Sequence, residues 1–402
     1  MLRVLAITKI FPNPAEPLSA PFNRQQFAAL ARRCELHVMG TIPWFPGAGL
    51  LGKWSTAGRL ARVPFHESIE GMTVTHPRTL FVPRLAHAAW GPLYALSIAP
   101  LLARYRGKVD VVLGSWAYPD GFAAVIAARL LGVPCVVKLH GSDINLNAKA
   151  AGPRRMIGWS LPRAARVVAV SRALADEVVA LGVPRERIAL VMNGVDAELF
   201  HPRDRGAART ELGLPAGPIA LYVGNLKEEK GILDLGAAWQ RVAHELPEAT
   251  LVVVGGGPLE GAFDALVAPL GERVRRVGSR PLATIPTWMA AADLLVLPSH
   301  AEGTPNVVLE ALASGAAVVT TRAGGIPSVV TDGVNGLLVE ERDTSGLASA
   351  IDRVLSDRDL AARLGGAARD RVLREGGWDH VAARIEAAYD RVASAAVGAG
   401  GA

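Results

Sequence analysis

Hydrophobic and polar positions alternate along the chain as short apolar runs followed by longer amphipathic stretches. The apolar runs include residues 3–10, Ile219–Val223 and Leu294–Leu297, and such runs are typical of buried strands in a parallel sheet. The stretches between them, such as 22–33 and 121–131, carry apolar residues at helical spacing. A repeated order of strand and helix predicts an α/β protein.

This alternation occurs in two series, which predicts two domains. The first series fills residues 1–200, and the second starts at Ile219. The segment 201–217 between them is rich in Arg, Pro and Gly, as interdomain linkers often are. We therefore expect Rossmann-like domains at 1–200 and 218–377, a linker at 201–217, and a separate C-terminal helix at 378–396.

Two segments of the first series do not follow the alternation. Residues 42–63 contain Pro, Gly and two Trp without clear periodicity, which indicates a surface insertion. Residues 85–105 predict a helix interrupted by proline that packs on the core or, as an alternative, contacts a membrane surface. The apolar part of this segment contains too many helix breakers for a transmembrane span, which needs ~20 apolar residues.

The stretch 302–310, Glu-Gly-Thr-Pro-Asn-Val-Val-Leu-Glu, follows one of the apolar strands. Thr304 suits a helix N-cap and Pro305 the first helical position, with the helix ending near Gly315. Ligands bind at the carboxyl ends of strands in open α/β sheets. The free N–H groups of a helix start favour an anion such as a diphosphate. Glu310 could accept hydrogen bonds from sugar hydroxyls, although two solvated glutamates on an ordinary helix remain the alternative.

Composition narrows the possible functions. The 402 residues are 50% hydrophobic, and the net charge is +6 with a pI near 9.6, which suits phosphorylated ligands or an anionic membrane surface. No zinc-type spacing or aromatic RNA-binding motif occurs, so we expect no nucleic-acid partner. Cys34 and Cys135 lie in apolar contexts and predict packing rather than a disulfide. The N-terminus has no secretion signal, which predicts a cytoplasmic protein.

The stretch 302–310 resembles the E-x7-E signature of the retaining GT-B glycosyltransferases of family four, written E-G-x-P-N-x-x-x-E-A. The positions that match are Glu302, Gly303, Pro305, Asn306, Glu310 and Ala311. The glutamate spacing alone is weakly specific, but the full string is strongly so. The family's first domain often has a Gly-Gly pair near residue 20, where this chain has Ala20 and Pro21.

Other strings extend this resemblance over nearly the whole chain. Residues 140–143, His-Gly-Ser-Asp, resemble H-G-x-D, whose histidine faces the donor sugar in the family. Residues 193–196, Asn-Gly-Val-Asp, match another family string, although they also suit a simple turn. Residues 224–231 resemble G-R-L-x-x-x-K-G, in which Arg and Lys hold the diphosphate. Here Asn225 replaces the Arg and Lys230 keeps the Lys, so Lys230 is expected to carry more of that role.

The resemblance implies two Rossmann-like domains facing a cleft, with the acceptor on the first and the nucleotide sugar mainly on the second. It also implies a final helix that crosses back to the first domain. The implied catalytic residues are His140, Lys230 and Glu302. The implied donor-binding residues are Gly224, Asn225, Lys230, Arg280, Gly303, Thr304, Pro305, Asn306, Val307 and Glu310.

The expected function is retaining, metal-independent transfer of a hexosyl group from a nucleotide diphosphate sugar, with no further cofactor. The expected acceptor is a glycan or a polyprenyl-linked sugar, handled in the cytoplasm at the inner membrane face. A non-catalytic nucleotide-sugar-binding protein is the main alternative. A nicotinamide-dependent oxidoreductase is disfavoured, because no Gly-rich turn follows the first strand. A PLP-dependent phosphorylase is disfavoured by the short chain.

Overall fold

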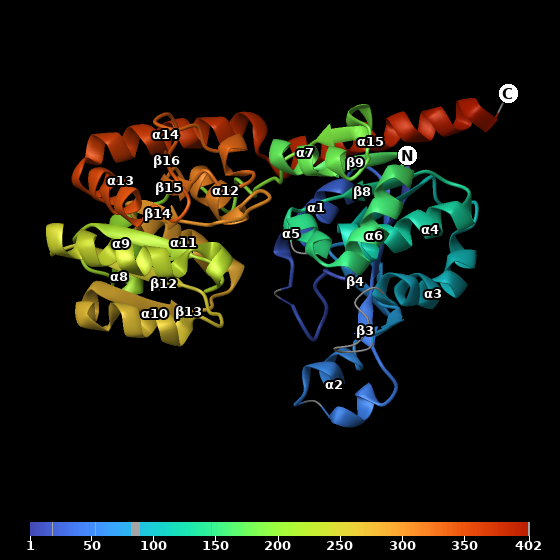
Figure 1. Cartoon of the computed structure of the whole chain (residues 1–402), viewed down its shortest axis with the longest axis horizontal. Coiled ribbons are helices and arrows are strands. Elements are labelled where there is room, and N and C mark those ends of the chain that lie inside the picture. The colour runs from blue at the N-terminus through green and yellow to red at the C-terminus, as the bar shows by residue number, and fades with distance from the viewer. Residues whose placement is uncertain (18, 53, 82–88, 146, 401–402) are drawn as a thin grey trace. The chain divides into compact units, whose positions relative to one another are not determined.

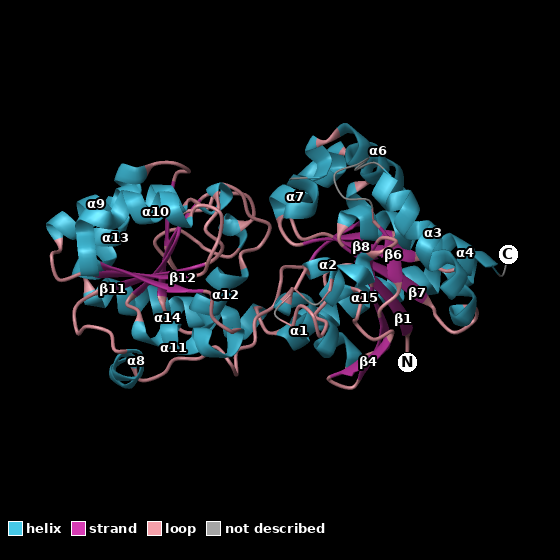
Figure 2. Cartoon of the chain, turned by 90° about the horizontal axis from the view of Figure 1, so that it is seen from below, coloured by secondary structure: helices cyan, strands magenta, loops and turns pink. Residues whose placement is uncertain are grey.

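A computed structural model describes all residues except 18, 53, 82–88, 146 and 401–402. The chain divides into two compact units, of which the first comprises Met1–Met192 with Trp378–Ala402 and the second comprises Asn193–Gly377. Each unit is an α/β layer structure, with a sheet between helices (Figure 1; Figure 2). The predicted pair of Rossmann-like folds is therefore confirmed.

The first unit is built on an eight-stranded sheet of order β10-β9-β8-β7-β1-β2-β5-β4, with a separate pair β3-β6. All neighbours in the large sheet are parallel except the antiparallel pair β4-β5. The strands are β1 (Arg3–Thr8), β2 (Glu35–Gly40), β3 (Ile42–Trp44), β4 (His66–Ile69), β5 (Met72–Thr75), β6 (Arg78–Leu80), β7 (Val111–Ser115), β8 (Cys135–Lys138), β9 (Arg166–Ala169) and β10 (Ile188–Leu190).

Helices cover both faces of this sheet. They are α1 (Pro21–Ala31), α2 (Thr56–Leu60), α3 (Trp90–Leu102), α4 (Phe122–Leu131), α5 (Ser142–Asn145), α6 (Ala151–Ser160), α7 (Arg172–Ala180) and α15 (Trp378–Gly400). One buried cluster joins the sheet to α3, α4, α6 and α7, and a second joins it to α1 and α15. Both cysteines are buried and free, as expected for packing residues.

The C-terminal helix α15 completes the first unit, as the resemblance implied. Its residues Val381, Ile385 and Tyr389 are at most 3% exposed and belong to the same cluster as α1. The indole N–H of Trp378 donates to Gln25 at 3.1 Å, and Arg33 pairs with Glu386 at 2.5 Å. Burial of large apolar side chains contributes roughly 1.5–3 kcal/mol each, so this helix is an integral part of the unit.

The second unit has a six-stranded parallel sheet of order β13-β12-β11-β14-β15-β16. Its strands are β11 (Ile219–Val223), β12 (Thr250–Val254), β13 (Val274–Gly278), β14 (Leu294–Leu297), β15 (Ala317–Thr321) and β16 (Leu337–Val339). Its helices are α8 (Arg205–Leu212), α9 (Ile232–Glu245), α10 (Glu260–Val267), α11 (Ile285–Ala291), α12 (Asn306–Ala313), α13 (Thr344–Ser356) and α14 (Arg358–Glu375). The strand order reverses at β11, and such switch points are where ligands bind.

The segment 201–217, expected as a linker, contains helix α8 and belongs to the second unit. Asp204 caps this helix by accepting from the N–H of Ala207 at 2.6 Å. Arg205 and Arg209 both pair with Asp293, at 2.5 and 2.7 Å. These ion pairs explain why an Arg-rich stretch is folded onto the domain rather than extended between domains.

The two irregular segments of the first unit have ordered parts. The insertion 42–63 contains β3 and α2, with Ile42, Leu60 and Val63 as its own small core. The expected helix at 85–105 is α3, which includes Pro100; residues 82–88 lie outside the described part. Tyr94, Ile98 and Leu102 of α3 pack in the core, whereas Leu96 is 71% exposed. Among the described residues, no helix has the length and apolar character that a membrane span requires.

Candidate active site

Several of the residues expected to form the site lie together at the carboxyl ends of β11 and β14 in the second unit. Nζ of Lys230, in the loop after β11, lies 2.5 Å from Oε1 of Glu302, in the loop after β14. The hydroxyl of Ser299 donates to the same carboxylate oxygen at 2.8 Å. The Glu302 side chain is only 8% exposed and that of Lys230 is 30% exposed. Two of the three residues expected to be catalytic are therefore in direct contact.

The backbone of the two loops explains why Lys230 and Glu302 meet. The N–H of His300 donates to the carbonyl of Glu229 at 2.9 Å, which ties one loop to the other. Gly231 has φ +64°, and a Cβ at this position would lie 1.8 Å from the carbonyl oxygen of Pro298. Only glycine combines this left-handed backbone with such a close approach. The loop after β11 is thereby held against the end of β14.

A second glycine contact holds the backbone of Glu302. Gly324 has φ +50°, and a Cβ there would lie 2.1 Å from the carbonyl oxygen of Glu302. The N–H of Gly325 donates to the same carbonyl at 3.0 Å. The loop after β15 therefore fixes the turn that presents the Glu302 side chain.

Helix α12 begins immediately after this turn. Its N-cap is Pro305, and its first residue is Asn306. The helix thus starts one residue later than expected, and Thr304 is not its N-cap. The C-terminal end matches the expectation, because Gly315 adopts φ +70° after the cap Ser314. Helix boundaries shift readily by one residue where Pro restricts the backbone before it.

The start of α12 offers free donors. The backbone N–H groups of Gly303, Asn306 and Val307 donate to no other group in the described part of the chain. Unsatisfied N–H groups and the positive end of the helix dipole favour an anion. Together with the Lys230 ammonium, they form a cationic surface suited to a diphosphate.

Glu310 lies one turn further along α12 and is partly buried. Its carboxylate accepts no hydrogen bond from the described residues, and burial raises its pKa to about 7. A partly buried carboxylate without donors is costly. Hydroxyl groups of a bound ligand would supply the missing donors.

The remaining residues of the expected donor site lie at the same edge of the sheet. Gly224 and Asn225 follow β11, and the carbonyl of Asn225 accepts from the Tyr222 hydroxyl at 3.0 Å. The Asn225 side chain is exposed. Arg280 follows the edge strand β13, is exposed, and donates to the carbonyl of Ser279 at 3.1 Å.

Sequence reasoning missed two residues that support this site. Ser299 holds Glu302, as described above. Asn193, for which a family string and a simple turn were both open, donates from its amide to the side-chain oxygen of Asn306 at 3.0 Å. The string at 193–196 was the only signal for this residue, and it did not indicate the contact.

His140 belongs to the first unit, where it follows β8. One ring nitrogen, Nε2, lies 3.1 Å from the hydroxyl of Ser115. The ring stacks on Trp116 at 5.5 Å and contacts Phe22 at 5.1 Å. The other ring nitrogen, Nδ1, is buried without a partner among the described residues. The ring is thus fixed in place with one nitrogen unused.

The loop after His140 is closed by Asp143. Its carboxylate accepts from the backbone N–H groups of His140, Gly141 and Ala117 at 2.8–3.0 Å. Burial, together with the nearby Lys138, lowers the pKa of His140 well below its usual value, so the imidazole is neutral at pH 7. A neutral ring both donates and accepts hydrogen bonds, as recognition of a sugar hydroxyl requires.

The described residues contain no cluster of three or more His, Cys, Asp or Glu side chains suited to a metal ion. Within the second unit, the site thus consists of an ammonium group, helix-start N–H groups and two carboxylates. This set of groups can hold a sugar linked to a phosphate anion.

The fold and this site define a glycosyltransferase of the GT-B type. A family model described as "Glycosyl transferases group 1" matches residues 217–357, and one described as "Glycosyltransferase Family 4" matches residues 28–199. The chain belongs to glycosyltransferase family 4.

Relatives and solved structures agree with this assignment. The chain is 31% identical to an alpha-maltose-1-phosphate synthase of Mycolicibacterium smegmatis, over 81% of this chain and 89% of the relative. Sucrose-phosphate synthase from Thermosynechococcus elongatus has the same fold, with a TM-score of 0.82, 22% identity, and coverage of 98% of this chain and 100% of that one. Anabaena HepE, solved in complex with UDP-glucose, has a TM-score of 0.75 and 21% identity, with coverage of 97% and 100%.

If hydroxyl groups of the donor bind Glu310, donor affinity should depend on pH. Hydrogen bonds donated to a carboxylate stabilise its charged form. Because the pKa of Glu310 is about 7, binding of the nucleotide sugar should release a proton from Glu310. We expect the affinity for a nucleotide sugar to fall as pH falls below 7, by up to about tenfold per unit. The measurement is titration calorimetry at several pH values.

The matched variant is Glu310→Gln. We expect its affinity for the nucleotide sugar to be weaker by about tenfold or more at pH 8. The reason is that a hydrogen bond to a charged carboxylate is stronger than one to a neutral amide. We also expect it to vary little with pH. The diphosphate of a nucleotide sugar is esterified at both ends and does not titrate in this range. An unchanged affinity in the folded variant would remove Glu310 from the donor site.

Proposed function

We propose that the protein transfers a hexosyl group from a nucleotide diphosphate sugar to a glycan or polyprenyl-linked acceptor, with retention at the anomeric carbon and without a metal ion. The observation that carries this proposal is the contact of Lys230 with Glu302 beside the start of α12. This contact places a cation, a carboxylate and free N–H donors together at the carboxyl ends of β11 and β14.

Each group has a role in this proposal. As the bond from the anomeric carbon to phosphate breaks, negative charge grows on the diphosphate. Lys230 and the N–H groups of Gly303, Asn306 and Val307 stabilise that charge, which is usually a large part of catalysis. Glu302 holds a sugar hydroxyl and, before the donor binds, neutralises Lys230.

The remaining residues bind rather than react. Glu310 accepts from hydroxyl groups of the donor, while Gly224, Asn225 and Arg280 lie along the nucleotide. In the first unit, His140 orients a bound sugar or forms a hydrogen bond with one of its hydroxyl groups. No further cofactor takes part.

The test of this function combines binding and turnover. A thermal-shift panel of UDP-, GDP-, ADP- and TDP-sugars should single out one donor, since a ligand at a hundredfold excess over Kd stabilises by about 2.7 kcal/mol. UDP-glucose is the first candidate, because HepE was solved with it. Transfer to a panel of glycan and lipid-linked acceptors, followed by NMR of the new linkage, should show the anomeric configuration of the donor retained.

The same assay in excess EDTA should give an unchanged rate, because Lys230 and the start of α12 supply the positive charge. Loss of transfer in EDTA and its recovery with magnesium would contradict this charge assignment. Donor binding without turnover on any acceptor would favour a non-catalytic nucleotide-sugar-binding protein.

We further propose that the protein works in the cytoplasm at the inner face of the membrane, where lipid-linked acceptors reside. The net charge of +6 and the exposed Leu96 on α3 support contact with an anionic surface. The protein should float with anionic vesicles at low salt and lose that association at high salt. Failure to float at low salt would count against a membrane-bound acceptor.

A further inference from the structure

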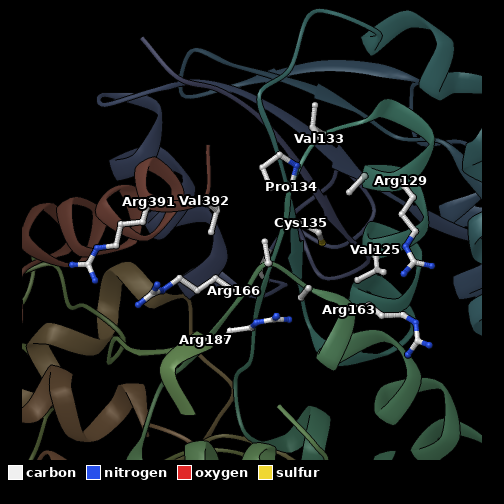
Figure 3. Close-up of a pocket in the computed structure, with 13 residues that line it drawn as sticks. Val125, Arg129, Val133, Pro134, Cys135, Arg163, Arg166, Arg187, Arg391 and Val392 are labelled. Carbon is white, nitrogen blue, oxygen red and sulfur yellow. The ribbon is translucent and has the colours of Figure 1, made fainter. Parts of the chain in front are cut away.

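An arginine-lined pocket lies in the first unit, away from the residues discussed so far. Its volume is about 450 Å³, within the range of roughly 300–1,000 Å³ typical of small-molecule sites. Five guanidinium side chains line it: Arg129, Arg163, Arg166, Arg187 and Arg391. No Asp or Glu is among its thirteen lining residues (Figure 3).

The pocket is at the amino ends of three neighbouring strands. Cys135 and Arg166 are the first residues of β8 and β9, and Arg187 immediately precedes β10. His140 follows the opposite end of β8, roughly 16 Å away at ~3.3 Å per residue. The arginine pocket therefore belongs to the opposite edge of the sheet from His140.

The five arginines come from separate segments of the chain and border the same pocket. In Figure 3, the guanidinium ends of Arg166 and Arg391 lie on the left, those of Arg129 and Arg163 lie on the right, and Arg187 lies between the two pairs. Arg391 belongs to α15 and Arg129 to α4. These helices cover opposite faces of the sheet, so the pocket lies where both helical layers meet the strand ends.

Contacts within the protein hold several of these side chains in place. Arg129 and Arg163 both lie against the ring of Trp159, at 5.2 and 4.9 Å from its centroid. Arg187 donates to the carbonyl of Pro162 at 3.3 Å. Side chains that are already ordered lose less entropy when a ligand binds.

The positive charge of the pocket is uncompensated. None of the five guanidinium groups forms an ion pair with a described residue. Nε of Arg166 is buried without a hydrogen-bond partner among the described residues. Burial, and then the charge of Arg391, lower the pKa of Arg166. A buried donor without a partner and neighbouring like charges both cost free energy, and an anion would relieve both.

We propose that this pocket binds an oligophosphate group, as a soluble small molecule or as the headgroup of an anionic lipid. The planar guanidinium fork matches phosphate oxygens, and five such groups in a space of this size exceed what a single phosphate needs. The bound group would bridge Arg166 of β9 to Arg391 of α15. This site is independent of the function proposed above.

The test uses the full-length protein with tripolyphosphate as the soluble probe, followed by calorimetry. We expect saturable binding that weakens as salt rises. The double variant Arg166→Gln/Arg391→Gln should weaken it by about tenfold or more, the scale of losing a charged hydrogen bond. Arg187→Gln, at an exposed position, should also weaken it and serves if the double variant fails to fold.

Two controls separate this pocket from other sites. Arg106→Gln removes one exposed positive charge elsewhere on the first unit and should leave tripolyphosphate binding unchanged. Lys230→Ala alters the proposed donor site and should leave the binding that depends on Arg166 and Arg391 in place. A loss of tripolyphosphate binding in Lys230→Ala alone would assign the probe to the second unit and overturn the proposal.

Vesicles distinguish the two sources of the phosphate. Flotation with phosphatidylcholine vesicles that contain phosphatidylinositol bisphosphate, whose headgroup carries several phosphates, but not with phosphatidylcholine alone, would identify a lipid headgroup if Arg166→Gln/Arg391→Gln abolishes it. Tripolyphosphate binding without flotation would identify a soluble ligand. Binding of neither probe, or binding that all pocket variants retain in full, would show that the pocket is not an oligophosphate site.

Discussion

Replacing Lys230 with alanine is expected to lower the turnover rate at saturating donor by more than about 100-fold, the scale of losing one preorganised donor to a developing anion. Lys230 is the cation that the structure places beside Glu302, at 2.5 Å. Asn225 is neutral where the family usually has Arg, so less charge is available to replace it. The loss should appear in kcat, because the diphosphate gains charge in the transition state.

The matched control is Lys227→Ala, which removes an exposed lysine from the same loop and should leave kcat within a few-fold. Asn225→Arg should be tolerated or mildly activating, because it restores the family's charge. A Lys230→Ala enzyme within a few-fold of the unaltered protein would mean that Lys230 is an ordinary surface residue.

Replacing Gly231 with alanine is expected to abolish activity and to destabilise the second unit. The left-handed backbone costs roughly 1–2 kcal/mol for any residue with a Cβ. The new methyl group would also lie 1.8 Å from the carbonyl oxygen of Pro298, and overpacking adds about 1–3 kcal/mol. The loop must move to relieve this clash, which carries Lys230 away from Glu302.

Gly213→Ala separates these two contributions. Gly213 has φ +61°, close to the +64° of Gly231, but its added Cβ would meet nothing within 4 Å. We expect Gly213→Ala to lower the free energy of unfolding slightly and to leave turnover intact. Denaturant unfolding and donor-saturated rates measure both variants. If the two substitutions lowered stability and turnover equally, the close approach of Gly231 to Pro298 would not matter for activity.

The strands could be predicted closely from the sequence because buried parallel strands are continuous apolar runs. Ile219–Val223 and Leu294–Leu297 have the same bounds in the structure as in the pattern. The proposed donor site could also be located from a short string of residues, since Glu302 and Glu310 lie in one turn and the helix that follows it. Local patterns suffice for such features.

Contacts between distant segments could not be predicted in the same way. Lys230 and Glu302 are separated by 72 positions, and their meeting depends on β11 lying beside β14 in the sheet order. The contact of Asn193 with Asn306 spans 113 positions and joins a segment between β10 and α8 to the start of α12. Helix α8 was missed because its Arg residues resemble those of a linker until Asp293 is seen to pair with them.

The position of α15 has a consequence for synthesis of the chain. Residues Met1–Met192 of the first unit precede the second unit in the sequence, yet α15, which covers one face of the first unit's sheet together with α1, follows it. At ~5–20 residues per second, the whole second unit is translated while that face awaits Val381, Ile385 and Tyr389. The second unit can therefore begin to fold before the first is complete, because the first unit awaits a helix that follows Gly377 in the sequence.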